Sequence, residues 1–135
     1  MSKKDFREIA HKIIKTHETS DPFLLAKFLN IQVIKIDFKS WLGLFSYVNG
    51  VKTIFINSNL DPLSQKVVCS HELGHSFQQF KDTVFMKENY LFGLSKIENE
   101  ANEFAAILVF FDLNIIDEYY TEKDLEMLQM LQKYI

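Results

Sequence analysis

The sequence is poor in the residues that mark several common protein classes. Among its 135 residues it has one cysteine, two prolines and four glycines. The low glycine and proline content excludes collagen-like and linker-rich chains. Cys69 has no partner for an internal disulfide, which favours a reducing, cytoplasmic location. The longest apolar run, Phe104–Phe111, is far too short for a membrane span, and no apolar signal-peptide stretch follows the first residues.

The composition that remains is typical of a folded domain. The chain is 47% hydrophobic and 24% charged, which excludes intrinsic disorder. Its net charge of -3 and its pI near 5.8 argue against a broad nucleic-acid-binding surface. The length suits one domain with its own core, so we expect residues 1–135 to form a single domain.

The hydrophobic pattern predicts an α+β fold. Apolar residues recur at helical spacing in five segments, and Asp-Pro pairs mark the starts of two of them. Asn49-Gly50 is a strong signal for a two-residue hairpin. We therefore expect a small antiparallel three-stranded sheet packed with helices. The expected strands are 31–36, 43–48 and 51–56, the expected helices are 6–17, 22–28, about 63–80, 96–111 and one within 115–135, and segment 81–96 is expected to be a loop.

The most informative stretch is His71-Glu72-Leu73-Gly74-His75. On a helix, His71 and His75 lie one turn apart on the same face, so both imidazoles can reach one metal ion. Two imidazoles suit zinc, and Glu72 is placed to take a proton from a water molecule rather than to coordinate. The pentapeptide alone also fits a buried helix whose two histidines fall four residues apart by chance.

A catalytic zinc site of this kind needs a third protein ligand, commonly a carboxylate. The segment 97–105 offers three. At about 100° per residue, Glu100 lies roughly 60° from the middle of the apolar face of that helix, whereas Glu98 and Glu103 lie roughly 100° and 120° away. The apolar face of this predicted helix consists of Ile97, Ala101, Phe104, Leu108 and Phe111. We therefore expect Glu100 to be the ligand and the other two glutamates to be solvated.

The sequence resembles the ImmA/IrrE family of metallo-endopeptidases. The resemblance rests on His71–His75 followed by Glu98–Ala105, with weaker similarity at 21–29, 42–48 and 54–57. It implies a zincin-like fold with the HExxH motif on a central helix, zinc bound by His71, His75 and Glu100, and Glu72 as the catalytic acid/base. It also implies an anti-repressor, encoded by a phage or mobile element, that cleaves or otherwise inactivates a helix-turn-helix repressor.

Other features leave alternatives open. The main rival to a protease is a non-catalytic, zinc-containing regulatory module that inactivates a transcription factor by binding, and a metal-bound sensor is a weaker one. Tyr47 and Tyr90 are both candidates to stabilise the oxyanion, and Cys69 fits a small core residue better than a nucleophile. We expect a protein substrate to pair along strand 43–48, with no direct contact to nucleic acid or membrane.

Overall fold

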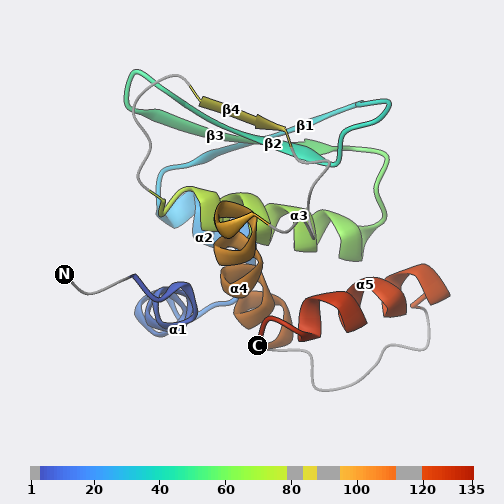
Figure 1. Cartoon of the computed structure of the whole chain (residues 1–135). Helices are drawn as coiled ribbons and strands as arrows, with labels where there is room; N and C mark the ends of the chain where they lie inside the picture. Colours follow the sequence, from blue (N-terminus) through green and yellow to red (C-terminus); the bar gives the residue numbers. More distant parts are fainter. Residues whose placement is uncertain (1–3, 79–83, 88–94, 112–119) are drawn as a thin grey trace.

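The computed structural model of the chain describes residues 4–78, 84–87, 95–111 and 120–135, with residues 84–87 described by their backbone alone (Figure 1). The fold is α+β, as the sequence predicts. The helices are α1 (Phe6–His17), α2 (Pro22–Phe28), α3 (Pro62–His75), α4 (Lys96–Phe111) and α5 (Glu122–Gln132), and the strands are β1 (Gln32–Ile36), β2 (Gly43–Val48), β3 (Val51–Asn57) and β4 (Val84–Lys87). None of the helices in the described part of the chain is long and apolar enough to cross a membrane.

The local signals in the sequence place most of these elements correctly. Asp21 and Asp61 cap α2 and α3, accepting hydrogen bonds from the backbone N–H of Phe23 and Ser64 at 3.0 and 2.7 Å. These caps satisfy amides that have no partner inside the helix. Asn49 and Gly50 have positive φ values of 50° and 78°, as a tight hairpin between β2 and β3 requires. The predicted helix starts and the predicted hairpin are therefore confirmed.

The sheet differs from the prediction in size and order. It has four strands in the order β1-β3-β2-β4, and β1 pairs with β3 in parallel, whereas β2 pairs with both β3 and β4 in antiparallel fashion. β1, β3 and β4 run in one direction and β2 runs in the other, so the sheet is mixed. β4 lies inside the segment that we expected to be a loop. The expectation of a three-stranded antiparallel sheet was wrong because alternation within each strand does not reveal which strand lies beside it.

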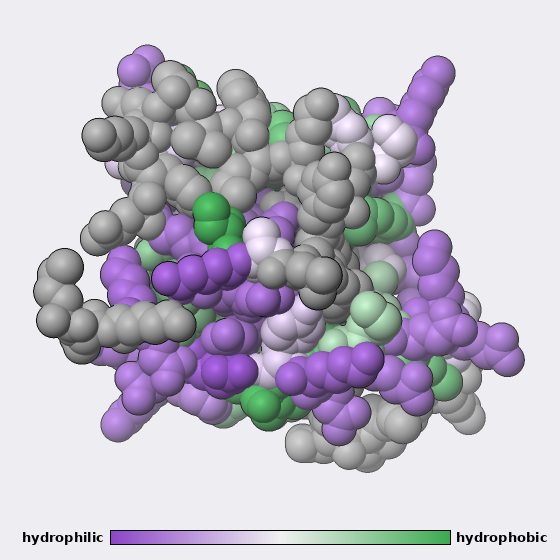
Figure 2. All heavy atoms as spheres, in the orientation of Figure 1, coloured by the Kyte–Doolittle hydropathy of each residue, from purple (hydrophilic) through white to green (hydrophobic). Residues whose placement is uncertain are grey.

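The helices are layered beneath the sheet (Figure 1). α3 lies between the sheet and α4, contacting β2 and β3 on one side and α4 on the other. α1 and α5 pack against α4. Two apolar clusters fill these interfaces, and α3 and α4 contribute side chains to both clusters. The face drawn in Figure 2 is largely hydrophilic where described residues form it. α3 and α4 are thus the central helices of the fold.

α3 ends earlier than its apolar pattern suggests. We expected a helix to about residue 80, but α3 ends at His75 and its C-cap is Ser76. The chain continues in tighter turns, with the N–H of Phe77 and of Gln78 bonded to the carbonyls three residues before them. Lys52 of β3 donates to the Ser76 carbonyl at 2.6 Å. The motif therefore occupies the last turn of α3, and the chain beyond it is free to turn toward α4.

Candidate metal centre

α3 brings the two motif histidines together inside the protein. The rings of His71 and His75 lie edge to face with their centroids 4.7 Å apart, and both side chains are fully buried. Their four-residue spacing puts them one above the other on a single face of the helix. Buried polar side chains are costly unless they are hydrogen-bonded or bind a metal. The pair therefore requires partners, which come from α4 and from the residues just after α3.

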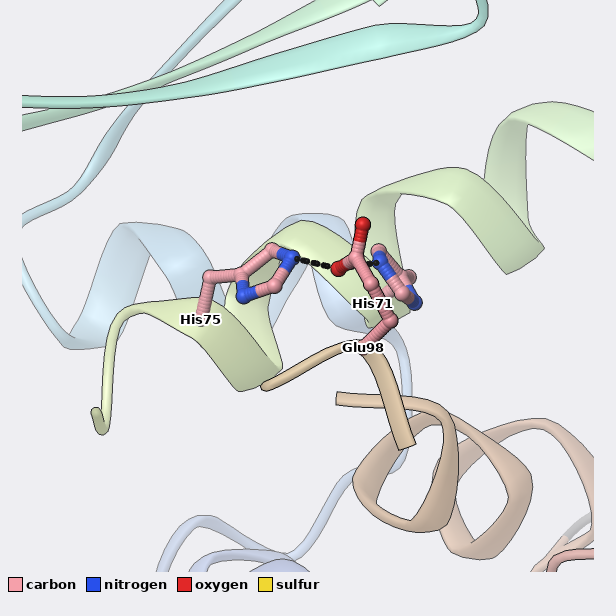
Figure 3. A group of neighbouring side chains, drawn as sticks. All are labelled: His71, His75 and Glu98. Carbon is pink, nitrogen blue, oxygen red and sulfur yellow. Dashed lines mark hydrogen bonds and ion pairs between the residues drawn. The ribbon is translucent and has the colours of Figure 1, made fainter. Parts of the chain in front are cut away.

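Glu98, in the first turn of α4, completes the group. Its Oε1 lies 3.2 Å from Nε2 of His71 and 2.8 Å from Nε2 of His75, so the carboxylate sits between the two rings (Figure 3). Among the residues that the structure describes, these three side chains form a buried group whose ligand atoms all lie within 4.8 Å of one another.

The geometry of this group fits a tetrahedral zinc site. Zinc–nitrogen and zinc–oxygen bonds of about 2.0–2.1 Å imply separations of about 3.3 Å between neighbouring ligand atoms. The nitrogen–oxygen separation is 3.2 Å for His71, close to that value, and 2.8 Å for His75, somewhat shorter than it. Two imidazoles and one carboxylate are also a ligand set that zinc uses in catalytic sites, where the fourth position is left for water. His71, His75 and Glu98 are thus the residues that could hold the ion.

The outer nitrogens of both rings are also engaged. Nδ1 of His71 donates to Oδ1 of Asn102 at 2.7 Å, and Nδ1 of His75 donates to Oε1 of Gln78 at 2.6 Å. Amide oxygens are acceptors only, so each Nδ1 carries the proton and each Nε2 faces Glu98. Histidine ligands of metal sites characteristically donate their second N–H in this way. Both rings are therefore oriented for coordination through Nε2.

The structure places Glu98, and not Glu100, against the histidines, which corrects the expected ligand set. Our prediction assumed that Ile97 and Phe111 point inward, but they are 41% and 50% exposed, whereas Glu98 is 7% exposed. Because α4 is covered on several sides, its apolar residues do not mark one inward face. A better signal was available: Glu98 and Asn102 are four residues apart and flank the small residue Ala101, as expected for a face in close contact with another helix.

Glycine makes that close contact possible. A Cβ atom on Gly74 of α3 would come within 3.0 Å of Cα and 3.1 Å of the carbonyl oxygen of Ala101 in α4. Such distances are shorter than ordinary van der Waals contact, so a larger residue would force the helices apart. Gly74 and Ala101 thus let α4 approach closely enough for Glu98 and Asn102 to reach the histidines.

Electrostatics favour the ionised form of Glu98. Burial opposes ionisation of this carboxyl group, but the hydrogen bonds and the charges of His71 and His75 outweigh that effect and lower its pKa to about 2. A carboxylate held as an anion between two imidazoles attracts positive charge. The ionised carboxylate is also the form of Glu98 that can coordinate a metal ion.

Glu72, the predicted acid/base, lies on the side of α3 that faces the sheet. Its side chain is fully buried, and a Cβ atom on Gly43 of β2 would lie 3.4 Å from its Oε2. The same Cβ would come within 2.6 Å of Cγ1 of Val68. Gly43 thus lets the β2 backbone pack directly over the carboxylate of Glu72. Glu72 follows His71 in the sequence but is not part of the group formed by His71, His75 and Glu98.

The remaining candidate residues fall in different places. Cys69 is fully buried, and burial, followed by the charge of Glu72, raises the pKa of its thiol, as expected for a core residue. Tyr47 lies on β2 with the ammonium group of Lys52 5.5 Å from its ring centroid. Tyr90 lies outside the described residues. A role for either tyrosine in oxyanion stabilisation stays a prediction.

The chain is similar to known proteins over most of its length. The family model described as the IrrE N-terminal-like domain matches residues 26–129, which include every residue of the ligand group. The chain is 41% identical over 110 residues to "Uncharacterized immunity region protein 2" of Bacillus phage phi105, which covers 80% of this chain and 69% of that protein. It is 28% identical over 110 residues to "Metallopeptidase ImmA" of Bacillus subtilis (strain 168), which covers 81% of this chain and 65% of that protein. No solved structure matches the chain. Because the family model covers most of the sequence, the chain belongs to the ImmA/IrrE family, within the IrrE N-terminal-like domain.

Proposed function

We propose that this chain is a zinc-dependent endopeptidase with a zincin-like active site. The observation that carries the proposal is the buried group of His71, His75 and Glu98, with Glu72 one residue away on the same helix. The name of the relative "Metallopeptidase ImmA" supports the same chemistry.

Each residue has a distinct part in the proposed reaction. His71, His75 and Glu98 would hold the ion, which when bound would supply a Lewis acid that polarises the scissile carbonyl and makes water easier to deprotonate. Glu72 accepts a proton from the attacking water and then donates it to the amine that leaves. The burial of Glu72 beneath Gly43 limits competing hydrogen bonds from bulk solvent. The fixed Nδ1–H bonds of the histidines keep both rings aligned through the cycle.

The proposed substrate is a helix-turn-helix repressor, and it binds as an extended strand at β4. We expected the substrate to pair along β2, but β2 is flanked by β3 and β4 within the sheet. β4 is the edge strand on this side among the residues that the structure describes, and edge strands leave backbone groups available for pairing. The neighbouring β2 carries Phe45, whose ring centroid is 6.4 Å from that of His75. We propose that a strand added to β4 approaches the candidate centre, with β4 lying between the added strand and β2. The phage immunity-region relative supports a repressor as partner.

The test is to replace Glu72 by Gln in the complete chain and to co-express it with the cognate repressor. Glu72→Gln keeps the size and hydrogen-bonding reach of the side chain but removes the basic carboxylate. We expect zinc content and partner binding to persist while cleavage falls by at least about a hundredfold. Repressor length on a gel and repressor activity from a reporter are measured together.

The same experiment separates the protease from the non-catalytic module. If Glu72→Gln relieves repression fully while the repressor stays intact, inactivation does not need bond cleavage and the protease proposal fails. If the repressor stays intact and active when it is co-expressed with Glu72→Gln, the proposal holds.

A further inference from the structure

Gln78 connects one motif histidine to α4 through both ends of its amide. It lies three residues beyond His75, after the end of α3, and is half-buried. Its Oε1 accepts the Nδ1–H of His75 at 2.6 Å. Its Nε2 donates to the backbone carbonyl of Ile97 at 2.9 Å and to Oε1 of Glu100 at 3.2 Å. The amide therefore spans the space between the end of α3 and the first turn of α4.

The two acceptors on α4 fix which way the amide points. A carbonyl and a carboxylate oxygen accept hydrogen bonds but cannot donate them, so the NH₂ end of Gln78 must face Ile97 and Glu100. The amide oxygen must then face His75, where it accepts only from a protonated Nδ1. That arrangement leaves Nε2 of His75 as the nitrogen directed at Glu98. Glu100 thus acts on the orientation of His75 through Gln78.

The two histidines are supported differently. His71 is held by Asn102, which is fully buried in α4. His75 is held by Gln78, which is half-buried and would be free to rotate without its two bonds to α4. Connected hydrogen bonds polarise one another, so the negative charge of Glu100 strengthens Gln78 as an acceptor and makes the imidazole of His75 a better donor of electrons.

We propose that Gln78 and Glu100 are positioning residues of the metal centre, which hold His75 in the tautomer and orientation that bind the ion. The proposal rests on the proposed function, since it assumes that the group formed with Glu98 binds zinc. Glu100 then contributes to the centre without touching the ion. Residues that hold a histidine ligand in this way typically contribute about 10–100-fold to metal affinity.

The first test measures the zinc dissociation constant of the complete chain by competition with a chelator. Gln78→Met preserves the length of the side chain and removes both ends of the amide, so we expect zinc to bind about 10–100-fold more weakly. Glu100→Leu should weaken binding by a smaller factor of about three to ten, because the Ile97 carbonyl still holds the amide. Glu100→Gln keeps an acceptor oxygen and should restore most of that loss.

The matched control is Glu103→Gln, on the same helix. Glu103 forms an ion pair with Arg7 at 3.3 Å and does not take part in the chain of bonds to His75. The zinc affinity of the Glu103→Gln variant should equal that of the wild type. Thermal melting of each variant without zinc identifies any loss of zinc affinity that comes from unfolding. If Gln78→Met does not fold, the comparison of Glu100→Leu with Glu100→Gln tests the proposal.

A second readout does not depend on affinity. In the zinc-loaded protein, long-range ¹H–¹⁵N spectra should show a slowly exchanging Nδ1–H on His75 that is lost in Gln78→Met and kept in Glu103→Gln. Wild-type affinity and an unchanged Nδ1–H signal in Gln78→Met would overturn the positioning role while leaving the zinc centre intact. A wild-type chain that binds no zinc would instead overturn the proposed function, and this proposal with it.

Discussion

The contact between α3 and α4 predicts that Gly74→Ala damages both stability and metal binding. The added Cβ would meet Cα of Ala101 at 3.0 Å, the Ala101 carbonyl oxygen at 3.1 Å and Cβ of Phe104 at 3.2 Å. All three atoms belong to the backbone of α4 or are attached directly to it, so no rotamer change relieves the contact. The helix itself has to move by a few tenths of an ångström.

The size of the effect follows from two opposing contributions. Overpacking a core typically costs about 1–3 kcal/mol. Replacing glycine by alanine inside a helix stabilises the fold by up to about 1 kcal/mol, because alanine has the higher helix propensity. Subtracting the full gain leaves about 0–2 kcal/mol, and three simultaneous close contacts place Gly74→Ala in the upper half of that range. We therefore expect the free energy of unfolding to fall by about 1–2 kcal/mol and Tm to fall by roughly 4–8 °C. Glu98 and Asn102 flank Ala101 and move with it, so zinc affinity should fall about tenfold.

The assays are urea unfolding of the metal-free chain and chelator competition for zinc. Ala101→Gly offers a sharp companion variant, because it removes a Cβ but leaves the Cα and carbonyl oxygen that the new methyl group meets. Adding Ala101→Gly to Gly74→Ala should therefore fail to restore either stability or affinity. Wild-type stability and affinity in Gly74→Ala, or full rescue by Ala101→Gly, would refute this account of the helix contact.

Two further predictions concern Glu98. Glu98→Ala should abolish zinc binding at micromolar metal in equilibrium dialysis, because it removes a ligand and the negative charge between the imidazoles; retention of wild-type zinc by Glu98→Ala would show that another residue completes the site. The metal-free chain should lose stability as the pH falls from about 4.5 towards 2. The pKa of Glu98 is about 2 in the folded chain against an ordinary value of 4.5, so its stabilising effect is complete above the unfolded pKa and is lost as the pH falls through the folded one. Glu98→Gln should flatten that part of the stability profile, and a profile unchanged by Glu98→Gln would contradict the charge interaction with the histidines.

The sequence predicts most of the local structure because the relevant signals are local. Asp61 before a proline marks the start of α3, and Asn49-Gly50 marks the hairpin, whatever the rest of the chain does. The spacing of His71 and His75 likewise predicts, from helical geometry alone, that both rings lie on one face of a helix. These features depend on residues within one or two turns of each other, and the structure confirms them as placed.

The features that the sequence does not predict depend on packing between distant segments. The carboxylate that lies beside the histidines was predicted wrongly because the exposed Ile97 contributed to the expected inward face, whereas contacts with several elements decide the burial of α4. The position of β3 between β1 and β2 depends on pairing that alternation does not encode. Gln78 was not identified because its role arises only where α3 ends and the chain meets Glu100.

The most direct measurement of the metal centre is anomalous X-ray diffraction at the zinc absorption edge, from crystals of the complete chain grown with zinc. The structure predicts one strong peak inside the protein, about 2.0–2.2 Å from Nε2 of His71, from Nε2 of His75 and from a carboxylate oxygen of Glu98. Glu100 should lie outside bonding distance and contact Gln78 instead. A peak coordinated by Glu100 in place of Glu98, or the absence of any peak between the two histidines, would contradict the account.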